Sequence, residues 1–276
     1  MPHIFIDGHV HIHPGFSWEE VLHHALHNFQ RIEEEVRPVQ SVRFLLLTES
    51  SGVDSFAALT ARTAQQGPAL GPFRIRQTSE ASTLSCEKDQ ISSFFVVAGR
   101  QIVTAERLEV LALGLHTPYP DGQPMGEVLA HLSGLPCLAV LPWGAGKWLG
   151  QRGKLVAQLS SQASAAPLFL GDNGNRPFFW PLPSLFARAK VQGIRNLAGS
   201  DPLPFPGQEK KVGSFGVWLS GTIDPLQPFS SLCTLLHNPK TALHPFGRCE
   251  SLYPFFKQQI LMQFKKKRPS SPSATP

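Results

Sequence analysis

Short apolar runs that end in polar, glycine-rich segments recur along the chain. The first run is Ile4-Phe5-Ile6, which leads into the polar residues 7–13, and the second run spans residues 42–47. Similar runs in the second half of the chain lie at residues 137–141, 168–170 and 195–198. Short apolar runs between turn-forming residues are typical of buried β-strands, so we predict a strand at each of these places.

Helical spacing fills several of the intervals between these runs. Ser17 and Glu20 have the spacing of a capping box, which marks the start of a helix. The apolar residues that follow recur every three or four positions, at Trp18, Val21, Leu22, Ala25, Phe29 and Ile32. We therefore predict a helix from residue 18. We predict further helices at residues 54–66, 126–132 and 249–264.

The middle of the chain has a different pattern. Residues 73–77, 94–103 and 108–115 are strand-like runs with short connections between them, and we expect them to form a local antiparallel addition beside the main sheet. Elsewhere strands and helices alternate, which is typical of a largely parallel α/β sheet or barrel. In such barrels the chemistry lies on loops at the carboxyl ends of the strands.

Length and composition fit one domain of this class. The chain has 276 residues, of which 42% are hydrophobic and 16% are charged, which suits a single α/β barrel. We expect this domain to span residues 1–264 and a disordered Pro/Ser-rich tail to span residues 265–276. The tail holds four basic residues, and they account for most of the net charge of +5. Because the body is almost neutral, we expect no nucleic-acid partner.

The sequence also bears on location. No apolar run approaches the ~18 residues of a membrane helix, and the chain does not open with a charged segment followed by a long apolar one. The four cysteines lie far apart without a C-x-x-C pair, which argues against a zinc knuckle and against a disulfide framework. We therefore predict a cytoplasmic protein that makes no membrane contact.

Candidate chemistry is concentrated directly after the first predicted strand. Asp7, His9, His11 and His13 occupy alternate positions, and alternate side chains of an extended segment point to one side. Two imidazoles on one face can bind a metal ion, and a nearby carboxylate can orient them or act as a further ligand. The alternative is a set of solvent-facing loop histidines.

The segment from Phe5 to His11 resembles the opening motif of the PHP (polymerase and histidinol phosphatase) superfamily and of the related amidohydrolases. Three later segments resemble PHP motifs in the same chain order. Residues 46–50 resemble the T-D-H strand end, residues 97–102 with 109–114 resemble the G-x-E strand and its hairpin, and residues 197–201 resemble the final G-S-D-x-H. The resemblance covers about residues 3–206 and implies a metal-dependent hydrolase on a distorted TIM-like (β/α)7-8 barrel.

The departures from the family pattern bear on the number of metal ions. Ser50, Gln101, Trp143 and Pro202 stand where the resemblance implies metal ligands. A neutral glutamine cannot bridge two cations as a carboxylate can. The ligands that remain are His9, His11 and Asp201, and Asp7 and Glu49 are further candidates for binding the metal. The sequence therefore favours one divalent ion (Zn, Mn or Fe) over three.

Two further polar residues follow predicted strands and are candidates for catalysis beside Asp201. His116 follows the run at 108–115, and Asp172 follows the run at 168–170. Strand ends are where catalytic acids and bases are often placed. The alternatives are a loop histidine and an Asp-Asn-Gly turn whose aspartate bonds to backbone.

A glycine-rich loop with cationic residues suggests where a substrate is bound. Trp143, Lys147 and Arg152 lie in or beside this loop, and Asn173 lies at another strand end. Such groups could bind an anion and line a pocket, although a flexible loop with a solvated lysine is equally consistent. Our leading hypothesis is a PHP-like hydrolase that depends on a single metal ion and acts on a small anionic ester, phosphoester or amide. The alternative is a catalytically silent PHP-like barrel that binds a ligand or partner.

Overall fold

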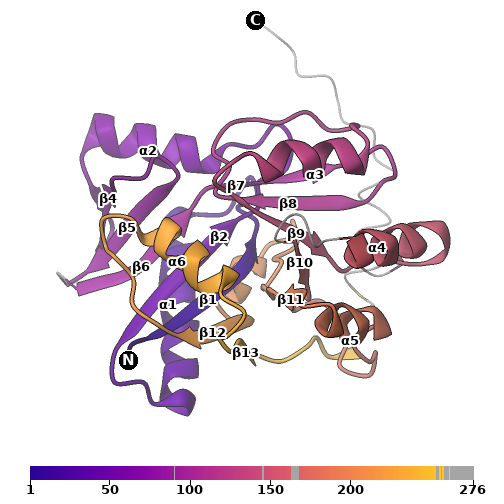
Figure 1. Ribbon diagram of the computed structural model, residues 1–276. Helices are drawn as coiled ribbons and strands as arrows, with labels where there is room; N and C mark the ends of the chain where they lie inside the picture. Colours follow the sequence, from indigo (N-terminus) through magenta and orange to yellow (C-terminus); the bar gives the residue numbers. More distant parts are fainter. Residues whose placement is uncertain are drawn as a thin grey trace, which may run out of the picture.

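The structure is a computed structural model and describes residues 1–89, 91–144, 146–162 and 168–252, together with 255, 257 and 261. It is a mixed α/β fold built on two sheets (Figure 1). The predicted tail, residues 265–276, lies outside the described residues, as does most of the helix predicted at 249–264.

The first sheet combines a parallel centre with antiparallel flanks. Its strands, in sheet order, are β13 (His244–Phe246), β12 (Gly216–Ser220), β1 (His3–Val10), β2 (Ser41–Leu47), β6 (Ile91–Val97), β5 (Thr83–Lys88), β4 (Phe73–Gln77) and β3 (Ala69–Leu70). The strands β1, β2 and β6 are parallel, and the other neighbours pair antiparallel. The strand β12, which runs antiparallel beside β1, was not predicted from the sequence.

The second sheet is smaller and also mixed. Its strands, in sheet order, are β11 (Arg195–Asn196), β10 (Leu168–Gly171), β9 (Leu138–Pro142), β8 (Glu109–Leu113) and β7 (Gly99–Val103). The strands β9, β10 and β11 are parallel, whereas β8 runs antiparallel to both β7 and β9. The predicted antiparallel strands are present, but they are divided between the two sheets, and β5, which was not predicted, lies between β4 and β6.

One predicted strand, at residues 94–103, proves to be two strands. The strand is interrupted at Ala98, so β6 lies in the first sheet and β7 lies in the second. Gly99 lets the chain cross here, because a Cβ at this position would lie 2.1 Å from the carbonyl oxygen of Leu47. Such close backbone approach is a position where only glycine fits.

A closed TIM-like (β/α)7-8 barrel is not confirmed, because the described strands form two separate sheets. Besides the core that they share, the two sheets are joined at one end by backbone hydrogen bonds. Gly8 N donates to Ala198 O at 2.9 Å and Asp201 N donates to His9 O at 2.8 Å, while Glu49 N donates to Gly99 O at 3.0 Å. This end of the molecule brings together the segments that carry most of the predicted site.

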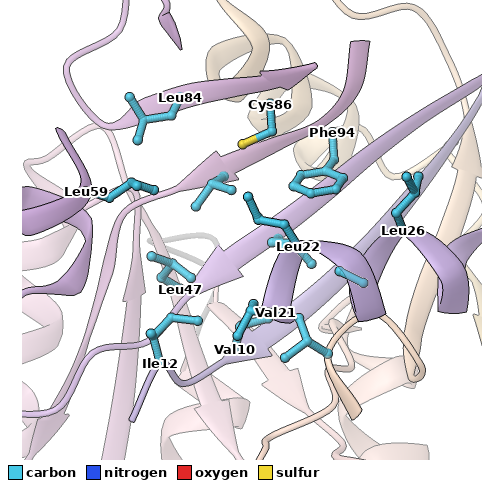
Figure 2. Packing of buried hydrophobic residues seen from close by; sticks show 14 of the residues in the cluster. Val10, Ile12, Val21, Leu22, Leu26, Leu47, Leu59, Leu84, Cys86 and Phe94 are labelled. Carbon is cyan, nitrogen blue, oxygen red and sulfur yellow. The ribbon is translucent and has the colours of Figure 1, made fainter. Parts of the chain in front are cut away.

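Apolar side chains on both faces of the strands build three cores. In β2, Leu45 and Leu47 face a core shared with helices α1 (Trp18–Val36) and α2 (Ser55–Gln66), as Figure 2 shows in part, whereas Phe44 and Leu46 face the second sheet. This alternation explains why the predicted strands read as continuous apolar runs.

The remaining helices complete the layers. The outer face of the second sheet packs on α3 (Met125–Ser133), α4 (Gly150–Gln162) and α5 (Ser184–Val191). The helix α6 (Pro228–His237) packs on the core between the sheets, and a short 3-10 helix, η2, spans Gln208–Lys211. Among the helices in the described part of the chain, none is both long enough and apolar enough to cross a bilayer.

Candidate metal centre

The candidate centre is built where the end of β1 meets the segment that follows β11. His9 lies at the end of β1 and His11 directly after it, and Asp201 comes from the other segment. The two segments are held together by the hydrogen bonds of Gly8 and Asp201 described above. Gly199 makes this approach possible, because a Cβ there would lie 2.1 Å from His9 N.

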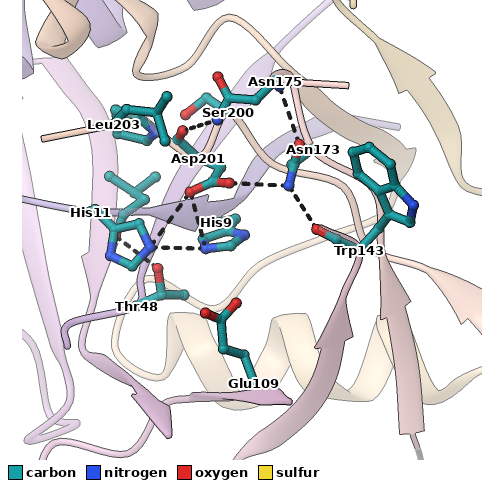
Figure 3. A network of polar contacts seen from close by, with 12 residues as sticks. His9, His11, Thr48, Glu109, Trp143, Asn173, Asn175, Ser200, Asp201 and Leu203 are labelled. Carbon is teal, nitrogen blue, oxygen red and sulfur yellow. Dashed lines mark hydrogen bonds and ion pairs between the residues drawn. The ribbon is translucent and has the colours of Figure 1, made fainter. Parts of the chain in front are cut away.

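The three side chains place their donor atoms in a small triangle. His9 Nε2 lies 3.0 Å from His11 Nε2, and Asp201 Oδ1 lies 3.5 Å from the first and 3.6 Å from the second (Figure 3). A tetrahedral ion with ligands at about 2.0–2.1 Å has donor atoms roughly 3.4 Å apart. The geometry of this group, His9, His11 and Asp201, therefore fits a single metal ion.

Asp201 is held firmly in an unusual conformation. Its φ of 48° lies in the left-handed region, which is uncommon for residues other than glycine and is often found at functional sites. Asn173 Nδ2 donates to its Oδ2 at 3.0 Å, and Asn175 Nδ2 donates to its backbone carbonyl. Burial would raise the pKa of the Asp201 carboxyl, but electrostatic interactions with His9, His11 and Lys147 and a hydrogen bond from Asn175 outweigh burial and lower the pKa.

The histidine at position 11 is kept neutral. Burial, together with the neighbouring His9, lowers the pKa of His11 to about 3. A neutral imidazole has a free lone pair, which is the form that binds a metal. The ring of His11 is therefore in its ligating form across the range in which proteins are usually studied.

Asp7 does not join this group of donor atoms. Its carboxylate is buried and accepts hydrogen bonds from Ser200 N and Gly213 N, both at 2.8 Å, and from His9 N at 3.3 Å. Burial raises the pKa of Asp7 to about 7, although the bonds from these groups lower it. The structure thus places Asp7 as a link between β1 and the segment that carries Asp201.

Glu49 is also placed away from the donor atoms. Its Oε1 accepts hydrogen bonds from Ser55 N and Phe56 N in the first turn of α2, and its Oε2 lies 3.6 Å from Arg100 Nη1. Burial raises the pKa of Glu49, against the effects of these hydrogen bonds and of Arg100. Negative groups at a helix N-terminus are stabilising, so the observed contacts are those of a helix cap.

A cavity of about 330 Å³ opens above the donor atoms. Its described lining residues are His9, His11, His13, Ser50, Gln101, Glu109, Trp143, Gly144, Lys147, Asn173, Asn175, Asp201, Pro202, Leu203, Pro204 and Phe255. Three predicted substrate-binding residues, Trp143, Lys147 and Asn173, therefore lie at the cavity. All four positions at which the family resemblance implied other ligands also line it.

Three other candidates are not brought to this cavity. His116 is exposed, and its carbonyl accepts a hydrogen bond from Arg100. The strand before it, β8, runs opposite to β9, so the carboxyl end of β8 lies beside the start of β9. Asp172 is paired through both of its oxygens with Arg176, and Arg152 donates to the carbonyl of Gly146.

Two polar residues in the described lining of the cavity were not predicted from the sequence. Glu109 lies at the beginning of β8, whereas the site residues predicted from the sequence follow the carboxyl ends of strands. Because β8 is antiparallel to β9, its beginning is the end that reaches the cavity. Asn175 lies two residues after Asn173 in the same polar loop, and that alternate spacing was a signal that could have found it.

Comparisons with known proteins support the fold. No protein-family model and no curated protein matches the chain. PsfC from Pseudomonas syringae PB-5123 is similar in structure over 97% of this chain and 99% of its own, with a TM-score of 0.51 and 12% identity. The lesion-specific endonuclease Q from Pyrococcus furiosus is similar over 97% of this chain and 67% of its own, with a TM-score of 0.50 and 12% identity. At this identity the likeness shows a PHP-like fold alone.

These comparisons correct one expectation. A further structure, of endonuclease Q with a 27-mer duplex carrying an abasic lesion at the active site, has a TM-score of 0.47, 10% identity, and covers 85% of this chain and 55% of its own. The Pyrococcus furiosus protein that shares this fold is an endonuclease, and our expectation of no nucleic-acid partner was wrong. A near-neutral net charge is a weak guide here, because local charges decide what a cleft attracts.

Proposed function

We propose that this chain is a PHP-like hydrolase that depends on one divalent metal ion bound by His9, His11 and Asp201. The observation that carries the proposal is the triangle of donor atoms, 3.0 to 3.6 Å apart, at the base of an open cavity. Two imidazoles and one carboxylate leave a position open for water, as in catalytic metal sites. Zinc, manganese and iron are all compatible with this donor set.

Each residue of the site has a role in this proposal. A metal ion bound here would lower the pKa of a water molecule and supply the nucleophile. Asp201 offers Oδ1, which faces the two rings, while Asn173 holds Oδ2 and so fixes the orientation of the carboxylate. The neutral ring of His11 offers its lone pair. The substrate would be an anionic ester, phosphoester or amide.

The residues at the four positions where the family resemblance implies further ligands favour one metal ion over three. Ser50, Gln101, Trp143 and Pro202 all line the cavity, yet none of them offers a carboxylate or an imidazole. The same observation favours a second candidate function, in which a catalytically silent PHP-like protein binds a ligand or partner through this cavity. We also propose that residues 1–264 act as one domain, since both sheets contribute residues to the site.

Metal content separates the two functions. The protein is purified without chelator and its bound zinc, manganese and iron are measured beside those of the double variant His9→Ala/His11→Ala. A third sample, His116→Ala, is the matched control, because His116 is an exposed histidine outside the cavity. We expect one equivalent of metal in the wild type and in the control, and loss of the metal in the double variant.

Absence of metal from the wild type, also after incubation with each of the three ions, would leave the silent protein as the better account. If metal is bound, screening of phosphoester, ester and amide substrates with added Mn²⁺ or Zn²⁺ tests for hydrolysis.

A further inference from the structure

Lys147 and Glu109 form an ion pair on the wall of the cavity. Lys147 Nζ donates to Glu109 Oε1, and the two side chains remain 36% and 18% exposed. Figure 3 shows the carboxylate of Glu109 on the side of His9 and Asp201. Both residues line the same cavity as the three donor side chains, so the pair faces whatever the cavity holds.

The local backbone folds Lys147 back onto this wall. Lys147 N donates to Gly144 O at 2.9 Å, which closes a turn. A Cβ at Gly144 would lie 2.7 Å from Cδ of Lys147, so the glycine leaves the space in which the lysine side chain lies. Arg152 Nη2 donates to Gly146 O at 3.0 Å and holds the loop from the other side. The position of the ammonium group is therefore defined by the loop as well as by Glu109.

Lys147 is also the residue that supplies a cationic side chain to the cavity. Among the described residues that line the cavity it is the one lysine or arginine. It therefore shares the cavity with the donor side chains of His9, His11 and Asp201. An anionic group bound to Lys147 would lie within reach of both the ion pair and the donor atoms.

We propose that Lys147 is the anion-binding residue of the cavity and that Glu109 masks it until an anionic group of the substrate displaces the carboxylate. This inference rests on the proposed function and names its substrate class, a molecule with a phosphate or carboxylate group. Displacement leaves Glu109 as a free acceptor. The site therefore favours an anion that carries a hydroxyl or amine donor beside it, which Glu109 can accept.

If Glu109 masks Lys147, replacing the two residues should change the affinity for an anion in opposite directions. Removing the cation removes anion binding, whereas removing the carboxylate frees the cation and strengthens anion binding. A purely structural ion pair predicts that neither change alters anion binding. We expect Glu109→Gln to bind an anion about 1.4- to fivefold more tightly, which is the range that corresponds to the free energy of a partly exposed ion pair.

The test titrates inorganic phosphate, and acetate in a separate arm, into the full-length protein after removal of metal with chelator. Trp143 lines the cavity, so tryptophan fluorescence is the readout, with calorimetry as a second one. The variants are Lys147→Met and Glu109→Gln, and the control is Lys154→Met, an exposed lysine on α4 outside the cavity. The two arms show whether the cavity prefers a phosphate or a carboxylate.

We expect saturable binding of at least one anion to the wild type and the control, tighter binding to Glu109→Gln, and none to Lys147→Met. Unchanged binding to Lys147→Met, weaker binding to Glu109→Gln, or no binding to any form would overturn the proposal. If Lys147→Met does not fold, Glu109→Gln still decides through the sign of its effect. Metal content is measured on a portion of each protein before the chelator is added, so a failure of the metal centre is recognised separately from a failure of the anion site.

Discussion

Replacing Gly199 with alanine should push apart the two backbone segments that carry the metal ligands. The added Cβ would lie 2.1 Å from N, 2.5 Å from Cβ and 2.7 Å from Cα of His9. These are atoms of the backbone and of the first side-chain carbon, so no flexible group can move aside. The segments must separate by roughly 1 Å to reach ordinary contact distances, as in other overpacked sites.

The cost of that separation can be worked out from the hydrogen bonds it strains. Gly8 N with Ala198 O, Asp201 N with His9 O, and Ser200 N with Asp7 Oδ1 all join the two segments. At about 0.5–1.5 kcal/mol for each bond, the free energy of unfolding should fall by about 2–4 kcal/mol. Metal ligands tolerate errors of only ±0.2 Å or so, so the metal should be lost as well.

The assay combines urea unfolding with metal content, on the wild type, Gly199→Ala and Gly126→Ala. Gly126 is the matched control, because it lies in α3 and a Cβ there would meet nothing within 4 Å. Alanine in a helix should leave stability unchanged or raise it by up to about 1 kcal/mol. If Gly199→Ala keeps wild-type stability and metal content, the proposed contact between the two segments is wrong.

Other parts of the structure make independent predictions. Asn173→Ala removes the hydrogen bond to Asp201 Oδ2 and should weaken metal binding about 10- to 100-fold, as measured by competition with a chelating dye. Glu80→Ala removes the carboxylate that accepts from the first N–H groups of α6 and should cost about 1 kcal/mol in thermal unfolding; an unchanged melting temperature would contradict this. Burial raises the pKa of Cys137 to about 11 and of Cys233 to about 12. Both thiols therefore stay protonated at neutral pH, and iodoacetamide should label them far more slowly in the native protein than in urea; equal rates would refute the burial argument.

The histidines of the site could be predicted from the sequence because they are local. His9 and His11 lie two residues apart at the end of one strand, and that spacing alone places them on one side. Asp201 is far away in the chain, and it came from the resemblance of residues 197–201 to a family motif. The structure brings it to the histidines through the pairing of that segment with the end of β1.

Strand direction explains what the sequence did not show. Glu109 begins the strand β8, and His116 follows that strand. An apolar run in the sequence does not reveal whether the strand will be parallel or antiparallel to its neighbours. Since β8 is antiparallel to β9, Glu109 reaches the cavity and His116 does not. The break at Ala98 is hidden for a similar reason, because both halves of the run are apolar.

The pairing of charges is equally hard to predict. Asp172 and Arg152 had suitable positions in the chain, but both have other partners in the structure. Asp172 pairs with Arg176, and Arg152 donates to the carbonyl of Gly146. The carboxylate of Glu49 accepts hydrogen bonds from backbone N–H groups at the start of α2. A polar residue at a strand end is available for chemistry only when no nearby group satisfies it, and this depends on contacts that the sequence pattern does not specify.

The most direct test of the metal centre is an anomalous-scattering measurement on crystals of the protein grown with zinc. The account predicts a single strong peak bonded to His9 Nε2, His11 Nε2 and Asp201 Oδ1, each at about 2.0–2.2 Å. No peak at this position, or a peak that His9 and His11 do not share, would contradict it.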